Sequence, residues 1–347
     1  MVNMNMKIRN AIFLSVLILC VWVMWRKTIE SYTGAPDPSS NATQTIFVSC
    51  ASYRDHKCMA TIKNMFERAK HPARIFVGVC EQNTQDARES CMPSSFKYHA
   101  NIRRLTIPHV EAKGPTYARY LCSTLYKGET WFMQIDSHTT FARDWDVKAI
   151  RNIIACPSKK AVLTGYPHDI STYGIDEKSV PLLCNSKWND DGLPQFEAAV
   201  KSKEDLDTKQ HWPVPFTAGG FVFGPGSLVA EVPFDPNLDH LFQGEEVLYS
   251  VRLWTSGYDF FSSKENIVFH AYTRKDEPKF WEDITDWSAP QKKSASRARR
   301  ILGLEQPAIP AGADPYGLGN ARTLAEYWKF AELDPTSKTS KSKEKFC

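Results

Sequence analysis

The segment Trp131–His138, with the sequence WFMQIDSH, runs from a buried-strand pattern directly into two potential metal ligands. Its apolar residues predict a strand, and Asp136 and His138 follow at positions i and i+2. Because residues two apart in an extended chain point to the same side, we expect both side chains together at the carboxyl end of the strand, where open α/β sheets bind ligands. A carboxylate and an imidazole can share one divalent cation of the kind that accompanies a nucleotide diphosphate. Taken alone, the triplet could equally be an ordinary turn at a strand end.

Strand and helix patterns alternate on both sides of this segment. The alternation favours a parallel or mixed sheet covered by helices. Residues 167–212 are rich in Pro, Gly, Asp and Ser, and we expect a long irregular insertion there, of the kind that often forms a lid or binds an acceptor. Besides 131–136, the predicted strands are 45–50, 74–79, 102–107 and 161–166, and the predicted helices are 59–70, 115–126 and 146–155.

The first 43 residues have the organisation of a membrane-anchored protein. Residues 11–25 carry no charge and are almost all apolar, and basic residues flank them on both sides. A cleaved signal peptide is the alternative, but the run ends in VWVMWR (21–26) without a small-x-small cleavage site. We therefore expect a cytoplasmic tail at 1–10, a retained signal anchor at 11–25 and a stem at 26–43. A glycosylation sequon at Asn41 fits a lumenal body in the Golgi or ER, as a single-pass type II protein. A cytosol-facing body is the alternative, because the flanking charges do not set the orientation.

The rest of the composition narrows the class of protein. The net charge is only +4, and no nucleic-acid-binding module is recognisable. The basic residues between 292 and 300 predict a solvated helix face, with contact to an acidic lipid or acceptor as the alternative. The nine cysteines include no Cys-x-x-Cys pair, which argues against a zinc site and leaves lumenal disulfides open. We expect one catalytic-size domain at 44–333, and a disordered tail at 334–347 because that segment is poor in apolar residues and rich in Lys and Ser.

Two segments could hold a phosphorylated ligand. Ser52, Tyr53 and Arg54 follow the first strand, where a nucleotide base and ribose could lie, although a solvated turn is as good an explanation. Arg119 lies one turn inside a helix that starts at Gly114-Pro115, so it could face phosphate oxygens beside the backbone donors of the helix start. A surface salt bridge is its alternative.

Three later segments could complete a site. Ala218-Gly219-Gly220 would let the backbone approach a ligand closely, or would mark a bulge in a strand. Glu245 and Glu246 open an apolar helix, where the helix dipole favours acids in any case. Because adjacent helical positions diverge by about 100°, we expect one carboxylate, Glu245, to face inward and the other to face outward. His270 ends another apolar run, and a lone histidine is more often a core or surface residue than a ligand.

The order of these segments resembles the polypeptide α-N-acetylglucosaminyltransferases, which use UDP-GlcNAc. The layout is also similar to that of the more distant polypeptide GalNAc-transferases. Both resemblances imply a GT-A fold, a Rossmann-like mixed α/β sheet flanked by helices. The matching segments are IFVSCASYRD (46–55), AKGPTYARYL (112–121), MQIDSH (133–138), AGGF (218–221), FQGEE (242–246) and the strand reaching His270.

The resemblance implies a role for each candidate. Asp136, His138 and His270 would bind a divalent cation, with Mn²⁺ favoured over Mg²⁺ because the ligands mix nitrogen and oxygen. Glu245 or Glu246 would act at the reacting centre. The residues implied for donor and nucleotide binding are Ser52, Tyr53, Arg54, Arg119, Asp136, Ala218, Gly219 and Gly220.

The implied activity is metal-dependent transfer of GlcNAc from UDP-GlcNAc to a hydroxyl of a protein acceptor (Thr, Ser or hydroxyproline), with retention at the anomeric carbon. The alternatives are another UDP-sugar, a glycan acceptor, or a membrane-anchored sugar-binding protein without catalysis. The anchor and the sequon fit a Golgi enzyme better than a cytosolic one.

Overall fold

The computed structural model describes residues 44–174, 178–204, 211–273 and 277–347. The predicted cytoplasmic tail, anchor and stem, with the sequon at Asn41, lie outside these residues. No helix in the described ranges is both long and apolar enough to cross a bilayer. Ala42–Cys347 forms one compact unit.

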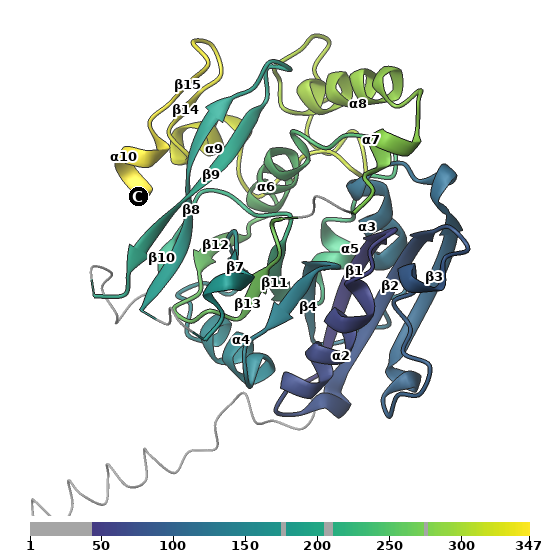
Figure 1. Ribbon diagram of the computed structural model, residues 1–347. Coiled ribbons are helices and arrows are strands. Elements are labelled where there is room, and N and C mark those ends of the chain that lie inside the picture. Colours follow the sequence, from purple (N-terminus) through teal and green to yellow (C-terminus); the bar gives the residue numbers. More distant parts are fainter. Residues whose placement is uncertain (1–43, 175–177, 205–210, 274–276) are drawn as a thin grey trace, which may run out of the picture. The chain divides into compact units, whose positions relative to one another are not determined.

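The centre of this unit is a mixed eight-stranded sheet with the order β10-β12-β6-β11-β4-β1-β2-β3 (Figure 1). Strands β4, β1, β2 and β3 run parallel to one another, whereas β11 runs antiparallel to both of its neighbours, β4 and β6. The first predicted strands are thus confirmed, and β4 carries the opening sequence segment. The strands are β1 (Ile46–Tyr53), β2 (Ile75–Asn83), β3 (Ile102–Pro108), β4 (Trp131–Asp136), β6 (Ala161–Thr164), β10 (Trp212–Pro213), β11 (Phe221–Pro225) and β12 (Asp259–Ser262).

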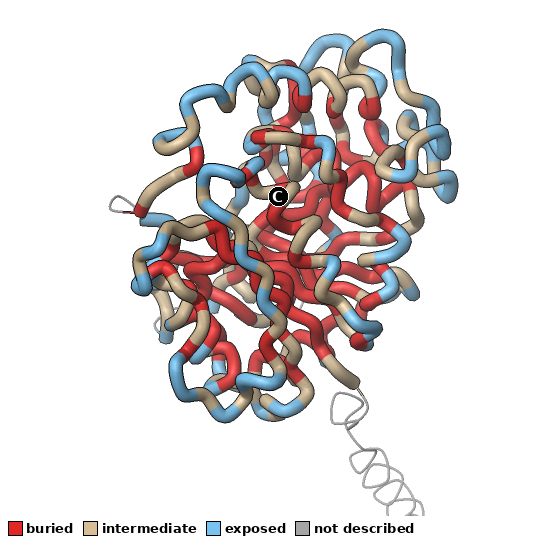
Figure 2. The backbone as a smooth tube through the Cα atoms, turned by 90° about the vertical axis from the view of Figure 1, so that its right-hand side faces the viewer, coloured by how far each residue is buried: buried red, intermediate tan, exposed pale blue. Residues whose placement is uncertain are grey.

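Helices cover both faces of the sheet because its strands are apolar on both sides. In β1, Phe47 packs into the core on one face, while Ile46 and Val48 pack into the core on the other. The buried positions form a continuous interior (Figure 2). Helices α2 (Cys58–Arg68) and α4 (Trp145–Ile154) cover one face, and α3 (Pro115–Ser123), α5 (Leu228–Glu231) and α6 (Glu245–Thr255) cover the other (Figure 1).

The prediction of an irregular insertion at 167–212 is wrong for most of that segment. Strands β8 (Ser179–Trp188) and β9 (Pro194–Ser202) form a long antiparallel hairpin, which packs Leu182, Leu183 and Phe196 into the core. The turn-forming residues had hidden this alternating pattern. A second, three-stranded sheet joins β5 (Thr139–Phe141), β13 (Val268–His270) and β7 (His168–Asp169), and it brings the strand end with His270 beside the loop after β4.

The prediction that 334–347 is disordered is also wrong. The segment forms β14 (Leu333–Asp334) with β15 (Thr339–Ser340), followed by α10 (Ser342–Phe346). A disulfide joins Cys347 to Cys184 of the hairpin, and Phe346 is buried. One covalent link and one buried aromatic ring thus order a chain of mostly polar residues. The remaining helices are α7 (Phe280–Asp283), α8 (Ser288–Ile301) and α9 (Leu324–Phe330), and the single-turn helices are 72–74, 87–89, 99–101, 109–111 and 170–172.

Two of the basic residues of α8 form ion pairs with other residues of the protein. Arg297 pairs with Asp235 and Asp314, and Arg299 pairs with Glu305. Lys292 and Lys293 are exposed, so the predicted solvated face is confirmed in part, whereas Arg297 and Arg299 are engaged in ion pairs.

Candidate active site

A cleft of about 480 Å³ lies at the carboxyl ends of β1, β2 and β4, the edge at which open α/β sheets bind ligands. Its volume suits a small-molecule ligand. All but three of the predicted site residues line it. Those that line it are Tyr53, Arg119, Asp136, His138, Gly219, Gly220, Glu245, Glu246 and His270.

Three potential metal ligands meet in this cleft. Asp136 ends β4, His138 follows it in the loop to β5, and His270 ends β13. One ligand atom from each residue lies within 4.8 Å of the others. The Nε2 atom of His270 is 3.0 Å from Oδ2 of Asp136, although the two residues are 134 positions apart in the chain. One carboxylate and two imidazoles with ligand atoms this close together form a possible donor set for a divalent cation.

The surroundings of Asp136 favour its charged form. Burial would raise the pKa of this carboxyl, but the hydrogen bond with His270 and the nearby His138 and Arg119 outweigh it and hold the pKa well below its usual range. A permanently ionised carboxylate at the floor of a cleft is suited to a cation.

A cation and two further carboxylates converge beside Gly219. The Arg119 guanidinium is buried, lies 2.7 Å from Glu245 and donates a hydrogen bond to the carbonyl of Gly219. Burial opposes the charge of Arg119, but Glu245 and Asp136 outweigh burial and raise its pKa. The alternative of a surface salt bridge is therefore wrong: Arg119 is an interior cation that faces the cleft.

The glycines of the 218–220 segment are needed for close packing. A Cβ atom on Gly219 would lie 2.7 Å from the Arg119 guanidinium and 2.9 Å from the Glu245 carboxylate. On Gly220 it would lie 3.2 Å from a carboxylate oxygen of Asp136. The glycines thus let the charged side chains of the protein approach the backbone. The sequence analysis had expected a ligand to approach the backbone there.

Both acids at the start of α6 point into the cleft, so the expectation of one inward and one outward carboxylate is wrong. Glu246 accepts hydrogen bonds from the backbone N–H of Gly219 at 2.6 Å and from the Tyr166 hydroxyl at 2.5 Å. Side chains in the first turn lean toward the helix N-terminus, where the 218–220 segment lies, so adjacent positions can reach the same group. Burial and the charge of Glu245 raise the pKa of Glu246 to about 7.

Three predicted residues do not line the cleft. Ser52 and Ala218 are buried, and Arg54 is turned away from it. Arg54 has a positive φ of 45° and pairs with Glu89 at 3.0 Å and with Asp283 of α7 at 2.7 Å. Tyr53 does line the cleft, and its hydroxyl donates to the same Asp283 at 2.7 Å. Arg54 therefore fastens α7 to the end of β1.

The sequence reasoning missed several residues of the site. Phe242 and Trp281 are exposed aromatic side chains that line the cleft and pack edge to face at 5.3 Å. Trp281 lies beyond His270, the last residue of the segments that the sequence analysis assigned to the site. Asp55 is buried, and its Oδ2 lies 2.7 Å from Nδ1 of His138. Its position in the polar run 52–55 looked like part of a solvated turn, and no local signal distinguishes it.

Comparison with known proteins agrees with this geometry. A family model described as Glycosyltransferase (GlcNAc) matches residues 45–99 and 86–337. No curated protein matches the sequence. The solved structure of GalNAc-T7 with UDP, GalNAc and Mn²⁺ is 16% identical with a TM-score of 0.53, and the match covers 87% of this chain and 56% of that one. A structure of S. aureus TarS 1–349 with UDP-GlcNAc is 13% identical with a TM-score of 0.46, over 78% of this chain and 69% of that one.

The chain thus spans about half the length of GalNAc-T7, and the likeness shows a shared GT-A fold. The two matched ranges of the family model cover most of the sequence, including every strand and helix that contributes to the cleft. This protein belongs to the GlcNAc glycosyltransferase family.

Proposed function

We propose that the protein transfers GlcNAc from UDP-GlcNAc to a hydroxyl group of a polypeptide, with a divalent cation held by Asp136, His138 and His270. One observation carries the proposal: these three potential ligands and the Arg119–Glu245 pair converge in one cleft of about 480 Å³. A diphosphate needs positive charge around it, and a sugar needs hydrogen-bonding groups beside it. The cleft supplies both from separate elements of the fold.

The residues present fit a divalent metal ion. The donor set of one carboxylate and two imidazoles suits Mn²⁺ better than Mg²⁺, which prefers oxygen ligands. When bound, such an ion neutralises charge that develops on a departing diphosphate. GalNAc-T7, which has the same fold, was solved with UDP and Mn²⁺, in agreement with this assignment.

The other polar residues of the cleft would bind the donor and assist the transfer to the acceptor. Arg119 presents a guanidinium that can reach phosphate or sugar oxygens, because its ion pair with Glu245 fixes its direction. Glu245 and Glu246 would hold donor hydroxyls or assist the acceptor hydroxyl. With a pKa near 7, Glu246 can either accept or release a proton close to neutral pH.

The polypeptide acceptor and the retention of anomeric configuration rest on the resemblance to the polypeptide α-GlcNAc-transferases. The test is a UDP-release assay with UDP-GlcNAc, UDP-GalNAc and UDP-glucose as donors and with Thr-, Ser- and hydroxyproline-containing peptides as acceptors. We expect UDP-GlcNAc and a peptide to give the highest rate, and NMR of the product to show an α-linkage. A preference for another donor or for a glycan acceptor would contradict this specificity while leaving the transferase assignment standing.

We also infer that the catalytic body faces the lumen of the Golgi or ER. Two disulfides, Cys58–Cys91 and Cys184–Cys347, join described elements of the body, and such bonds persist in oxidising compartments. The test is protease protection in sealed microsomes, combined with endoglycosidase digestion at Asn41. A protease-accessible, unglycosylated body would place it in the cytosol.

A further inference from the structure

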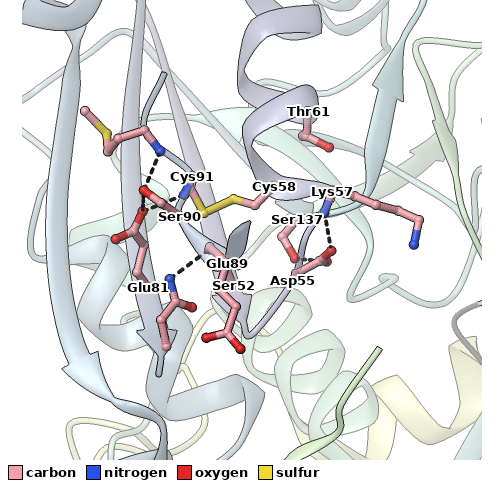
Figure 3. The surroundings of a disulfide bond; sticks show 12 residues. Ser52, Asp55, Lys57, Cys58, Thr61, Glu81, Glu89, Ser90, Cys91 and Ser137 are labelled. Atoms are coloured by element: carbon pink, nitrogen blue, oxygen red, sulfur yellow. Dashed lines mark hydrogen bonds between the residues drawn. A yellow bond between two sulfur atoms is a disulfide. The ribbon is translucent and has the colours of Figure 1, made fainter. Parts of the chain in front are cut away.

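Asp55 is a completely buried carboxylate next to the proposed metal ligands. It lies between β1 and α2, directly after Arg54, whose φ is positive. Taking a carboxylate out of water is costly unless hydrogen bonds replace the lost water. Asp55 has such bonds: its Oδ1 accepts from the backbone N–H of Lys57 at 2.9 Å, and its Oδ2 accepts from the Ser137 hydroxyl at 2.6 Å. Figure 3 shows these contacts beside the first turn of α2.

The same oxygen of Asp55 lies 2.7 Å from Nδ1 of His138. A carboxylate oxygen in this position accepts a hydrogen bond from an N–H group, so it favours the tautomer of His138 with hydrogen on Nδ1. The other ring nitrogen, Nε2, is then left with a free lone pair. Metal-binding histidines are commonly held in this way by a carboxylate behind the ring.

The second imidazole of the site lacks this arrangement. His270 directs Nε2 at Asp136, while its Nδ1 is buried and has no hydrogen-bond partner among the described residues. The rings of His138 and His270 lie 4.5 Å apart at 67°, so the orientation of one limits the other. Asp55 therefore fixes the orientation of His138 directly and, through the contact between the two rings, limits the orientation of His270.

We propose that Asp55 is a positioning residue for the metal site: it fixes the tautomer and the direction of His138 so that Nε2 faces Asp136 and His270. The inference rests on the proposed metal-dependent function. It adds a residue outside the cleft lining, and it assigns the buried charge of Asp55 to preorganisation of the ligand set.

Asp55→Asn tests this proposal, because asparagine keeps the shape and removes the charge. Its matched control is Asp146→Asn on α4. Asp146 is also buried, but its two oxygens accept backbone N–H groups of Lys70 and His71, both at 2.8 Å, away from the cleft. Both variants and the wild type are titrated with Mn²⁺ alone and followed by electron paramagnetic resonance, and their unfolding temperatures are measured without metal.

We expect Asp55→Asn to weaken Mn²⁺ binding by about 10- to 100-fold, as is usual when such a partner is lost. Asp146→Asn should change the affinity by less than about twofold, even if it lowers the unfolding temperature as much. In metal-free wild-type protein labelled with ¹⁵N-histidine, His138 should show hydrogen on Nδ1, and Asp55→Asn should lose this preference. His138→Gln identifies its signal among the nine histidines.

Equal Mn²⁺ affinity in folded Asp55→Asn and wild type would overturn the inference and leave the proposed function intact. Failure of the wild type to bind Mn²⁺ would overturn the metal dependence and this inference with it. If Asp55→Asn does not fold, Ser137→Ala replaces it. This variant keeps the Asp55–His138 contact, so it should bind Mn²⁺ within about twofold of wild type and keep the Nδ1 tautomer. A tenfold loss in Ser137→Ala that leaves the Nδ1 tautomer of His138 unchanged would instead assign the positioning to the hydroxyl and contradict the role of Asp55.

Discussion

Two networks of charged side chains in this protein differ in their ratio of carboxylates to guanidinium groups and in what surrounds them. The cleft network, Arg119, Asp136, Glu245 and Glu246, sets three carboxylates against one guanidinium around a cavity. The C-terminal network, Asp235, Arg297 and Asp314, joins α8 to the body through ion pairs of 2.7 and 2.8 Å. Carboxylates outnumber guanidinium groups in both networks, but only the carboxylates of the cleft network line an open space, where a cation can be received. The difference indicates that the cleft network is arranged for a ligand and the C-terminal network for the fold.

Replacing Asp136 should give the largest effect on activity. It should leave the stability nearly unchanged and so distinguish the role of the cleft network from that of the C-terminal network. We expect Asp136→Ala to lower kcat/KM for UDP-GlcNAc by at least about 10³-fold, equivalent to about 4 kcal/mol of transition-state stabilisation, because the site loses its ionised ligand. Steady-state assays and thermal unfolding measure the two consequences. The unfolding temperature should stay close to that of wild type. Substantial activity in a folded Asp136→Ala protein would remove the cleft network from catalysis.

Replacing Asp235 should have the opposite effect: the protein should lose stability and keep its activity. This carboxylate is completely buried and pairs with Arg297, so Asp235→Ala should lower the free energy of unfolding by about 3 kcal/mol. Denaturant unfolding gives the stability, and kcat at saturating donor should remain within about twofold at temperatures where the variant is folded. A large loss of kcat in the folded variant would show that the C-terminal network also serves the reaction.

The excess charge of the cleft network should appear in the pH dependence of stability. A glutamate in the unfolded chain ionises near 4.5, whereas burial and Glu245 raise the pKa of Glu246 to about 7. Between these values the folded protein keeps a proton that the unfolded chain has lost, so the free energy of unfolding falls as pH rises from 4.5 to 7. Without metal, we expect Glu246→Gln to lose this component, which is about 2–3 kcal/mol across the window.

Other groups titrate in the same range. Burial lowers the pKa of His211 to about 4, and this contributes with the opposite slope. The quantity to measure is therefore the difference between wild type and Glu246→Gln in chemical denaturation at several pH values. A difference that does not change with pH would contradict the raised pKa.

Removing the disulfide at the C-terminus should have a smaller effect, away from both networks. Cys347→Ala opens the bond to Cys184, so α10 loses its covalent link to the hairpin. The loss of stability should be about 2 kcal/mol, at the low end for disulfides, because Phe346 stays buried and continues to hold the segment. Calorimetry of the variant checks this. An unchanged unfolding temperature would mean that the disulfide adds nothing to the packing.

The sequence predicted strands β1, β2, β3 and β4 well, because each of these elements carries its own pattern of apolar residues. The runs that became β1, β2 and β4 each begin with three consecutive apolar residues, and α2 has one apolar face. Asp136 and His138 were found because a strand end presents them together. These signals are local, and local signals can be recovered from a single sequence.

The remaining features depend on partners far away in the chain. The order of the C-terminal tail depends on a cysteine 163 positions earlier. Glu245 and Glu246 both reach Gly219 because another segment crosses the end of their helix. Asp55 acquires its contact with His138 only when β1 and β4 pair. Periodicity along the chain carries no information on such contacts.

Calorimetric titration with UDP tests most directly whether the cleft network is a metal–diphosphate site. The measurement compares wild type and Asp136→Ala, each with Mn²⁺ and with a chelator in its place. We expect the wild type to bind UDP in Mn²⁺, to lose at least about tenfold in affinity with the chelator, and to regain it when Mn²⁺ is restored. Asp136→Ala should bind weakly in both conditions. Equal UDP affinity in all four experiments would contradict the account, because the excess negative charge of the cleft would then have no cation to receive.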